Sequence, residues 1–138
     1  MHKILIAVDG SEHARKAVSF VADLAMGARL EAILLNVQPE PEIRSVALAR
    51  EAVVTAERNE VRAATAAAET ALKAAGVPVT VCVEHGDPAA AIVRLAAETD
   101  CDHIVMGTRG LGSLAGLVMG SVATKVLHLA HVPVTLVK

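Results

Sequence analysis

The sequence has very few aromatic residues: it contains no Trp and no Tyr, and Phe20 is its only Phe. Proteins that bind single-stranded nucleic acid use aromatic side chains as stacking platforms, and nucleic-acid surfaces in general need clustered Lys and Arg. The formal net charge is −2, and no basic run occurs. A nucleic-acid-binding surface is therefore not expected.

Long apolar runs are also missing. The longest stretch without a charged residue covers positions 110–124, which is 15 residues with four glycines. A membrane-spanning helix needs about 20 apolar residues. Positions 4–8 form an apolar run of only five residues, shorter than the core of a signal peptide. We therefore expect no membrane span, no export by that route, and a location in the cytoplasm.

Cysteine is scarce, because Cys82 and Cys101 are the only two and lie 19 positions apart without a C-x-x-C pattern. This spacing favours two reduced thiols in or beside strands over a redox site. Histidines do not suggest a metal site either. His128 and His131 are three positions apart, but the sequence offers no third ligand near them. We expect no metal bound by protein groups alone.

Aliphatic and small residues are abundant, since hydrophobic residues make up 54% of the 138 positions. This length fits one domain, residues 1–138. Short apolar runs alternate with segments of helical spacing. The predicted strands cover residues 3–8, 30–37, 77–83, 102–106 and 132–137. One predicted helix follows Ser11, and three more cover residues 42–75, 88–98 and 122–130. This alternation predicts a doubly wound α/β fold, with an open five-stranded parallel sheet and helices on both faces.

A glycine-rich loop at positions 107–121 (GTRGLGSLAGLVMGS) follows the fourth predicted strand and precedes the last predicted helix. Unhindered glycine amides and the positive end of a helix dipole suit a phosphate group. The P-loop pattern is absent, and the G-x-G-x-x-A string from Gly110 has no acidic partner, because positions 111–138 contain no Asp or Glu. The loop therefore predicts a nucleotide phosphate site of another kind.

The spacing of this loop resembles the G-x2-G-x9-G-[ST] nucleotide loop of the universal stress protein family, in its ATP-binding branch. Similar segments occur at positions 8–12 (VDGSE), 86–88 (GDP), 102–107 (DHIVMG) and 132–134 (VPV), so the resemblance covers nearly the whole chain. It implies the strand order 3-2-1-4-5. Ligands of such sheets bind where the strand order reverses. Here that point lies between strands one and four, so Asp9 and Gly107 face one crevice.

The resemblance implies an adenine-nucleotide ligand, which is ATP, ADP or AMP. At the adenosine end it implies Ala7, Asp9, Val37 and Met106, with Val37 offering backbone to adenine and Met106 forming part of the wall. Ala7 departs mildly from the family, where many relatives have proline or valine. Asp9 can hydrogen-bond ribose or help to hold Mg beside the phosphates. Its alternative role is to close the turn before the first helix.

At the phosphate end, the resemblance implies that Gly107, Arg109 and Gly110 border ribose and phosphates. Gly120, Ser121 and Val122 present amides to the phosphates, together with the Ser121 hydroxyl. Arg109 is the main counter-charge in this hypothesis. No nucleophile elbow of the G-x-S-x-G type occurs in the sequence. The predicted function is therefore an ATP-binding stress-response or signalling module with at most slow hydrolysis, acting with a protein partner that the sequence does not name.

Two functions of other classes stay open. The first is an adenylyl transferase of the adenine-nucleotide α-hydrolase type, which needs a glycine-serine loop after strand one that residues 9–12 only partly resemble. The second is a protein-interaction module that binds no nucleotide. Residues 132–137 (VPVTLV) bear on assembly, because this last strand forms a sheet edge without protecting charges. We expect a homodimer in which these strands pair, and the family resemblance points to antiparallel pairing.

Overall fold

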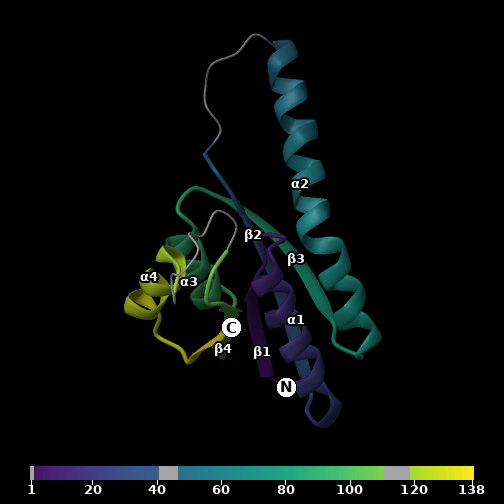
Figure 1. Cartoon of the computed structure of the whole chain (residues 1–138), viewed down its shortest axis with the longest axis vertical. Coiled ribbons are helices and arrows are strands. Elements are labelled where there is room, and N and C mark those ends of the chain that lie inside the picture. Colours follow the sequence, from purple (N-terminus) through teal and green to yellow (C-terminus); the bar gives the residue numbers. More distant parts are fainter. Residues whose placement is uncertain (1, 41–46, 111–118) are drawn as a thin grey trace.

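The computed structural model describes residues 2–40, 47–110 and 119–138, and its elements alternate between strands and helices (Figure 1). The strands are β1 (His2–Ala7), β2 (Leu30–Gln38), β3 (Val79–His85), β4 (His103–Gly107) and β5 (Val134–Val137). The helices are α1 (Glu12–Leu24), α2 (Ala47–Ala74), α3 (Pro88–Glu98) and α4 (Ser121–Leu129), and the 3-10 turn η1 (Ala25–Gly27) follows α1.

All neighbouring strands pair in parallel, in the order β3-β2-β1-β4-β5. This confirms the predicted doubly wound class and the strand order 3-2-1-4-5. Ile6 of β1 is in register with Leu34 of β2 on one side and with Val105 of β4 on the other. The first half of the chain extends the sheet from β1 through β2 to β3, and the second half adds β4 and β5 on the other side of β1. The strand order therefore reverses between β1 and β4.

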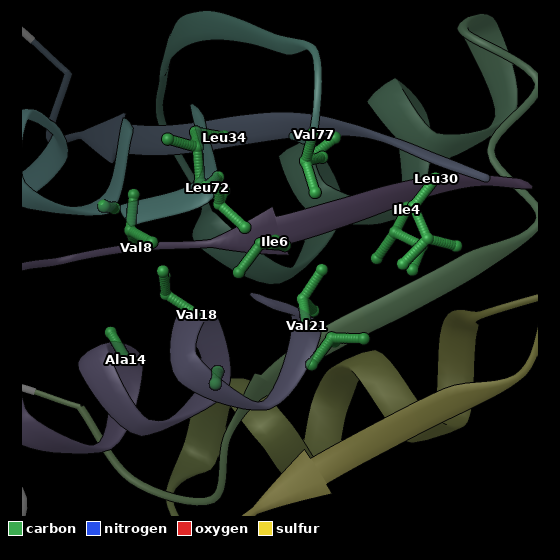
Figure 2. Close-up of a cluster of buried hydrophobic side chains, with 14 residues drawn as sticks. Ile4, Ile6, Val8, Ala14, Val18, Val21, Leu30, Leu34, Leu72 and Val77 are labelled. Carbon is green, nitrogen blue, oxygen red and sulfur yellow. The ribbon is translucent and has the colours of Figure 1, made fainter. Parts of the chain in front are cut away.

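Alternate residues of the strands face opposite sides of the sheet, as the period of two requires. Ile4 and Ile6 of β1 pack with α1 and α2 in one buried cluster, whereas Leu5 packs with α3 and α4 in another. Figure 2 shows the first cluster, in which side chains of α1 and α2 converge on β1. The central strands are therefore covered on both faces, which explains their continuous apolar runs.

Helix starts follow the expected capping chemistry. The Ser11 hydroxyl accepts a hydrogen bond from the amide of Ala14 at 3.2 Å and caps α1. Asp87 accepts from the amide of Ala90 at 3.0 Å and caps α3, with Pro88 in the first turn. Both caps satisfy amides that have no partner within the helix.

Helix α2 is anchored to the sheet through its C-terminal half. Ala68 and Leu72 are buried in the first cluster, whereas residues 50–56 are all exposed. In Figure 1 this N-terminal half projects beyond the carboxyl end of the sheet. We predicted one helix over residues 42–75. The helix that the structure describes begins at Ala47, and positions 41–46 lie outside the described residues.

Two predicted strands begin two residues later than expected. β3 starts at Val79 because Val77 instead packs in the first cluster and donates its amide to the Leu72 carbonyl, which ends α2. β5 starts at Val134 and not at position 132. Pro133 precedes the strand, and its carbonyl accepts from the amide of Ile104 at 3.0 Å. A proline has no backbone N–H to donate to a neighbouring strand, so it suits the position just before a strand begins.

Both cysteines are free thiols, with Cys82 half-buried in β3 and Cys101 buried just before β4. Burial is the main reason that the pKa of each thiol lies above its ordinary value. Across the described ranges, no group of three or more His, Cys, Asp or Glu side chains is arranged to hold a metal ion. None of the helices described has both the length and the apolar character that crossing a membrane requires.

Candidate functional site

A cavity of about 400 Å³ opens at the carboxyl ends of β1 and β4, where the strand order reverses. Its walls come from the ends of β1, β2 and β4 and from the starts of α1, α3 and α4. The lining residues are Ala7, Val8, Asp9, Ser11, Ala14, Leu35, Val37, Pro88, Ile92, Met106, Gly107, Thr108, Arg109, Gly110, Gly120, Ser121, Val122 and Ala123. All ten residues that the family resemblance implies belong to this set.

One side of the cavity is aliphatic. Ala7, Leu35, Val37, Ile92 and Met106 contribute to it, and each belongs to or packs against the buried cluster on the α3 and α4 side of the sheet. These residues come from three adjacent strands and one helix. Such a wall suits a flat apolar ring, because it removes the ring from water without demanding hydrogen bonds from it.

Asp9 lies in the turn between β1 and α1. Its Oδ1 accepts a hydrogen bond from the amide of Ser11 at 2.9 Å. This is the turn-closing role that we named as the alternative for Asp9. The residue also lines the cavity, so the turn holds its carboxylate at the cavity wall. The two roles are therefore compatible.

Gly107 and Gly110 are glycines because other chain segments approach them closely. A Cβ atom at Gly107 would lie 2.6 Å from the Cβ of His13 and 2.9 Å from its backbone carbon. A Cβ atom at Gly110 would collide with the Asp9 carboxylate. The absence of side chains here lets α1 and its preceding turn pack directly against the end of β4 and the loop that follows it.

Helix α4 begins at the cavity wall without a side-chain cap among the described residues. Gly120 occupies the cap position with φ −76° and ψ 165°, an extended conformation. Its own amide donates to the Thr108 carbonyl at 2.7 Å. We expect Gly120 to present its amide to phosphate, and in the structure this amide is bonded to the Thr108 carbonyl. Ser121 and Val122, in the first turn of the helix, retain the amide role in the hypothesis.

Arg109 is the sole Lys or Arg among the described residues that line the cavity. Its Nη2 lies 3.2 Å from Nε2 of His13 on α1. Its Nε is buried and has no hydrogen-bond partner within the described part of the chain. A buried donor without a partner costs free energy, and an anionic ligand in the cavity is suited to supply that partner.

Two polar groups behind the cavity were not predicted from the sequence. Asn36 is buried in β2 and donates to the Val8 carbonyl at 2.8 Å, and Gln38 donates to the Asn36 side chain at 2.5 Å. These hydrogen bonds hold Val8, which lies between the end of β1 and Asp9. Their signal in the sequence is the interruption of an apolar run by Asn and Gln. The role of His13 has no such signal, because its partner Arg109 lies 96 positions away.

With this geometry in view, the sequence pattern of the universal stress protein family matches residues 1–138. The chain is 39% identical over 138 residues to the "universal stress protein in QAH/OAS sulfhydrylase 3'region" of Thermus aquaticus, covering 98% of this chain and 97% of that protein. The protein described here belongs to the universal stress protein family.

Solved structures agree with this assignment. Hypothetical protein MJ0577 superimposes with a TM-score of 0.87 at 31% identity, over 99% of this chain and 95% of that chain. A universal stress protein solved in complex with cAMP gives a TM-score of 0.75 at 27% identity, over 99% of this chain and 97% of that chain. The ligand of the latter is an adenine nucleotide.

Proposed function

We propose that this protein is an adenine-nucleotide-binding module of a stress-response or signalling system, with ATP as its ligand and at most slow hydrolysis. The observation that carries the proposal is the cavity at the reversal point, because it combines an aliphatic wall, the uncapped start of α4 and the Arg109 guanidinium. An adenine nucleotide has matching parts, namely a flat heteroaromatic ring with apolar faces at one end and anionic phosphates at the other. The cAMP complex of a 27% identical relative supports the same ligand class.

In this proposal, adenine lies against Ala7, Val37 and Met106, and ribose lies near Asp9. The phosphates lie at the start of α4, where the helix dipole and the first-turn amides favour negative charge. Arg109 supplies the counter-charge. When Mg accompanies the nucleotide, the Asp9 carboxylate is the group that would assist in holding it, since Mg takes oxygen ligands and few protein groups.

A substitution of Gly120 tests the phosphate position. The backbone at Gly120 is extended, a conformation that any residue adopts, and Asp is a favourable cap for α4. Gly120→Asp should therefore fold with no loss of stability and yet bind ATP far more weakly. Gly120→Asn has the same size and caps the same amides without charge. By calorimetry, the Asp variant should bind ATP at least about tenfold more weakly than the Asn variant, because of its negative charge.

Equal ATP affinity in folded Gly120→Asp and in the unaltered protein would contradict the site. Mass spectrometry of small molecules released from the purified protein identifies the nucleotide independently. An adenine nucleotide is the expected result, and its mass distinguishes ATP from ADP and AMP. A protein that carries no nucleotide and binds none when it is added would instead be an interaction module.

Turnover of ATP should be slow. Among the described lining residues, Asp9 is the one carboxylate, and neither His, Cys nor Lys is present. Without an evident base or nucleophile, the rate should fall far below the usual enzyme range of about 1–10³ per second. Incubation of the pure protein with ATP and Mg, followed by phosphate and pyrophosphate assays, measures this. Rapid pyrophosphate release would support the transferase alternative, and rapid phosphate release would identify an ATPase.

The proposal includes a homodimer that acts in the cytoplasm. β5 is one of the two edge strands of the described sheet, and its residues Val134, Thr135, Leu136 and Val137 are half-buried and uncharged. An edge strand of this composition offers unpaired backbone groups to a second chain. Antiparallel pairing of two β5 strands would satisfy these groups in a closed symmetric assembly. Fractionation of cells that produce the protein tests the location.

A further inference from the structure

His13 contacts Arg109, a residue that lines the cavity. It lies on α1, is not itself a lining residue, and its Nε2 is 3.2 Å from Nη2 of Arg109. A guanidinium has donors only and stays charged in proteins. Arg109 must therefore donate in this contact, and Nε2 of His13 is the acceptor.

The position of the imidazole is set by the packing of α1. Gly107, which ends β4, lies so close to His13 that no side chain would fit between them. The Cβ and backbone of His13 are thus held against the end of β4, two positions before Arg109 in the chain. The ring reaches from this fixed base to the guanidinium. Arg109 is consequently held from one side, while its buried Nε has no partner in the described part of the chain.

We propose that His13 is a positioning residue for Arg109, and that it sets how strongly the cavity prefers adenine ligands with phosphates over adenosine. This inference rests on the proposed nucleotide site and adds to it a residue outside the cavity lining. An arginine that is already oriented loses less side-chain entropy when a phosphate binds. Removing the imidazole acceptor should therefore weaken the binding of phosphate groups and leave adenine and ribose unaffected.

The test compares ATP with adenosine in matched variants. His13→Ala removes the acceptor but keeps the Cβ that packs on Gly107, so the contact between α1 and β4 is preserved. His13→Gln returns an acceptor oxygen at a similar reach. Lys16→Ala changes an exposed residue of the same helix and serves as the control. Each variant is titrated with ATP by calorimetry and with adenosine by displacement, and its thermal unfolding is recorded.

We expect His13→Ala to bind ATP about tenfold more weakly, which is the order of the entropy cost of immobilising one long side chain, with adenosine affinity unchanged. His13→Gln should recover most of the loss, and Lys16→Ala should match the unaltered protein. A double-mutant cycle with Arg109→Ala tests whether the effect of His13 on ATP affinity depends on Arg109. In the Arg109→Ala background, His13→Ala should cause no further loss of ATP affinity.

Each other outcome overturns the inference in a distinct way. Unchanged ATP affinity in His13→Ala shows that the contact does not orient Arg109 for phosphate. Equal losses for ATP and adenosine show a general structural role for His13. A full loss in the Arg109→Ala background shows that His13 acts without Arg109. If the unaltered protein binds neither ATP nor adenosine, the proposed function itself fails, and this inference fails with it.

Discussion

Asp87 caps α3 with a carboxylate that several groups keep charged. The amide of Ala90 donates to its Oδ2 at 3.0 Å, and Nζ of Lys125 on α4 lies 3.0 Å from the same oxygen. The backbone hydrogen bond, followed by the Lys125 contact, holds the pKa of Asp87 below its ordinary value. Folding therefore favours the deprotonated form of this side chain.

The pH dependence follows from that direction. A carboxylate with a lowered pKa stabilises the fold at pH values above its ordinary, unfolded pKa, and this contribution disappears as the pH falls through the folded pKa. Asp87→Asn should thus be less stable than the unaltered protein at neutral pH and equally stable at pH values below the folded pKa of Asp87. Urea unfolding at the two pH values measures the difference.

Lys125→Met serves as the comparison for Asp87→Asn. Since the backbone bond is the larger cause of the lowered pKa, this variant should lose less stability at neutral pH than Asp87→Asn. The reverse order would show that the link between α3 and α4, and not the cap, dominates. A stability gap for Asp87→Asn that persists in acid would contradict the assigned charge state.

At the scale of elements, α2 divides into an anchored half and an exposed half. Leu72 is 0% exposed and packs in the cluster of Figure 2, whereas Val53 is 53% exposed. Leu72→Ala should lower the free energy of unfolding by about 2–5 kcal/mol, through lost burial and the cavity left behind. Val53→Ala should change it by no more than about 0.5 kcal/mol. Urea unfolding monitored by circular dichroism compares the two, and similar losses would show that the whole helix is anchored.

The elements themselves were largely predictable from the sequence, because buried parallel strands produce short apolar runs and helices produce amphipathic spacing. The late start of β5 follows from Pro133 and was missed because residues 132–137 read as one apolar run. The residues that the family resemblance implies for the site all line one cavity. Contacts across the fold were not predictable: the bond from Gly120 to Thr108 and the contact of His13 with Arg109 depend on how packed elements meet, which no local pattern encodes.

For the whole molecule, the proposed dimer can be tested at its edge strand. Val134→Asp combined with Leu136→Asp places two negative charges on each of the two paired strands and should convert the dimer to a monomer. These side chains also pack partly against the second cluster, so circular dichroism must show that the variant is folded. Light scattering measures the mass of each form.

The opposite edge provides the matched control. Val81 and Val83 of β3 are 36% and 39% exposed, and Val81→Asp with Val83→Asp adds the same charge there. This control should remain dimeric. A monomeric mass for the unaltered protein would contradict the dimer outright, and loss of the dimer only in the β3 variant would move the interface to the other edge of the sheet.

The division of α2 also determines how the protein opens in time. Amide hydrogens exchange with solvent when their hydrogen bonds break, and the required opening ranges from local fraying to unfolding of the whole domain. Residues 50–56 bury no side chain, so their amides exchange by fraying from the start of the helix. The amides around Leu72 are released only when the packing against β1 and β2 is lost. A single continuous helix thus reports two processes, with slow exchange at the end that packs on the sheet and fast exchange at the end that projects beyond it.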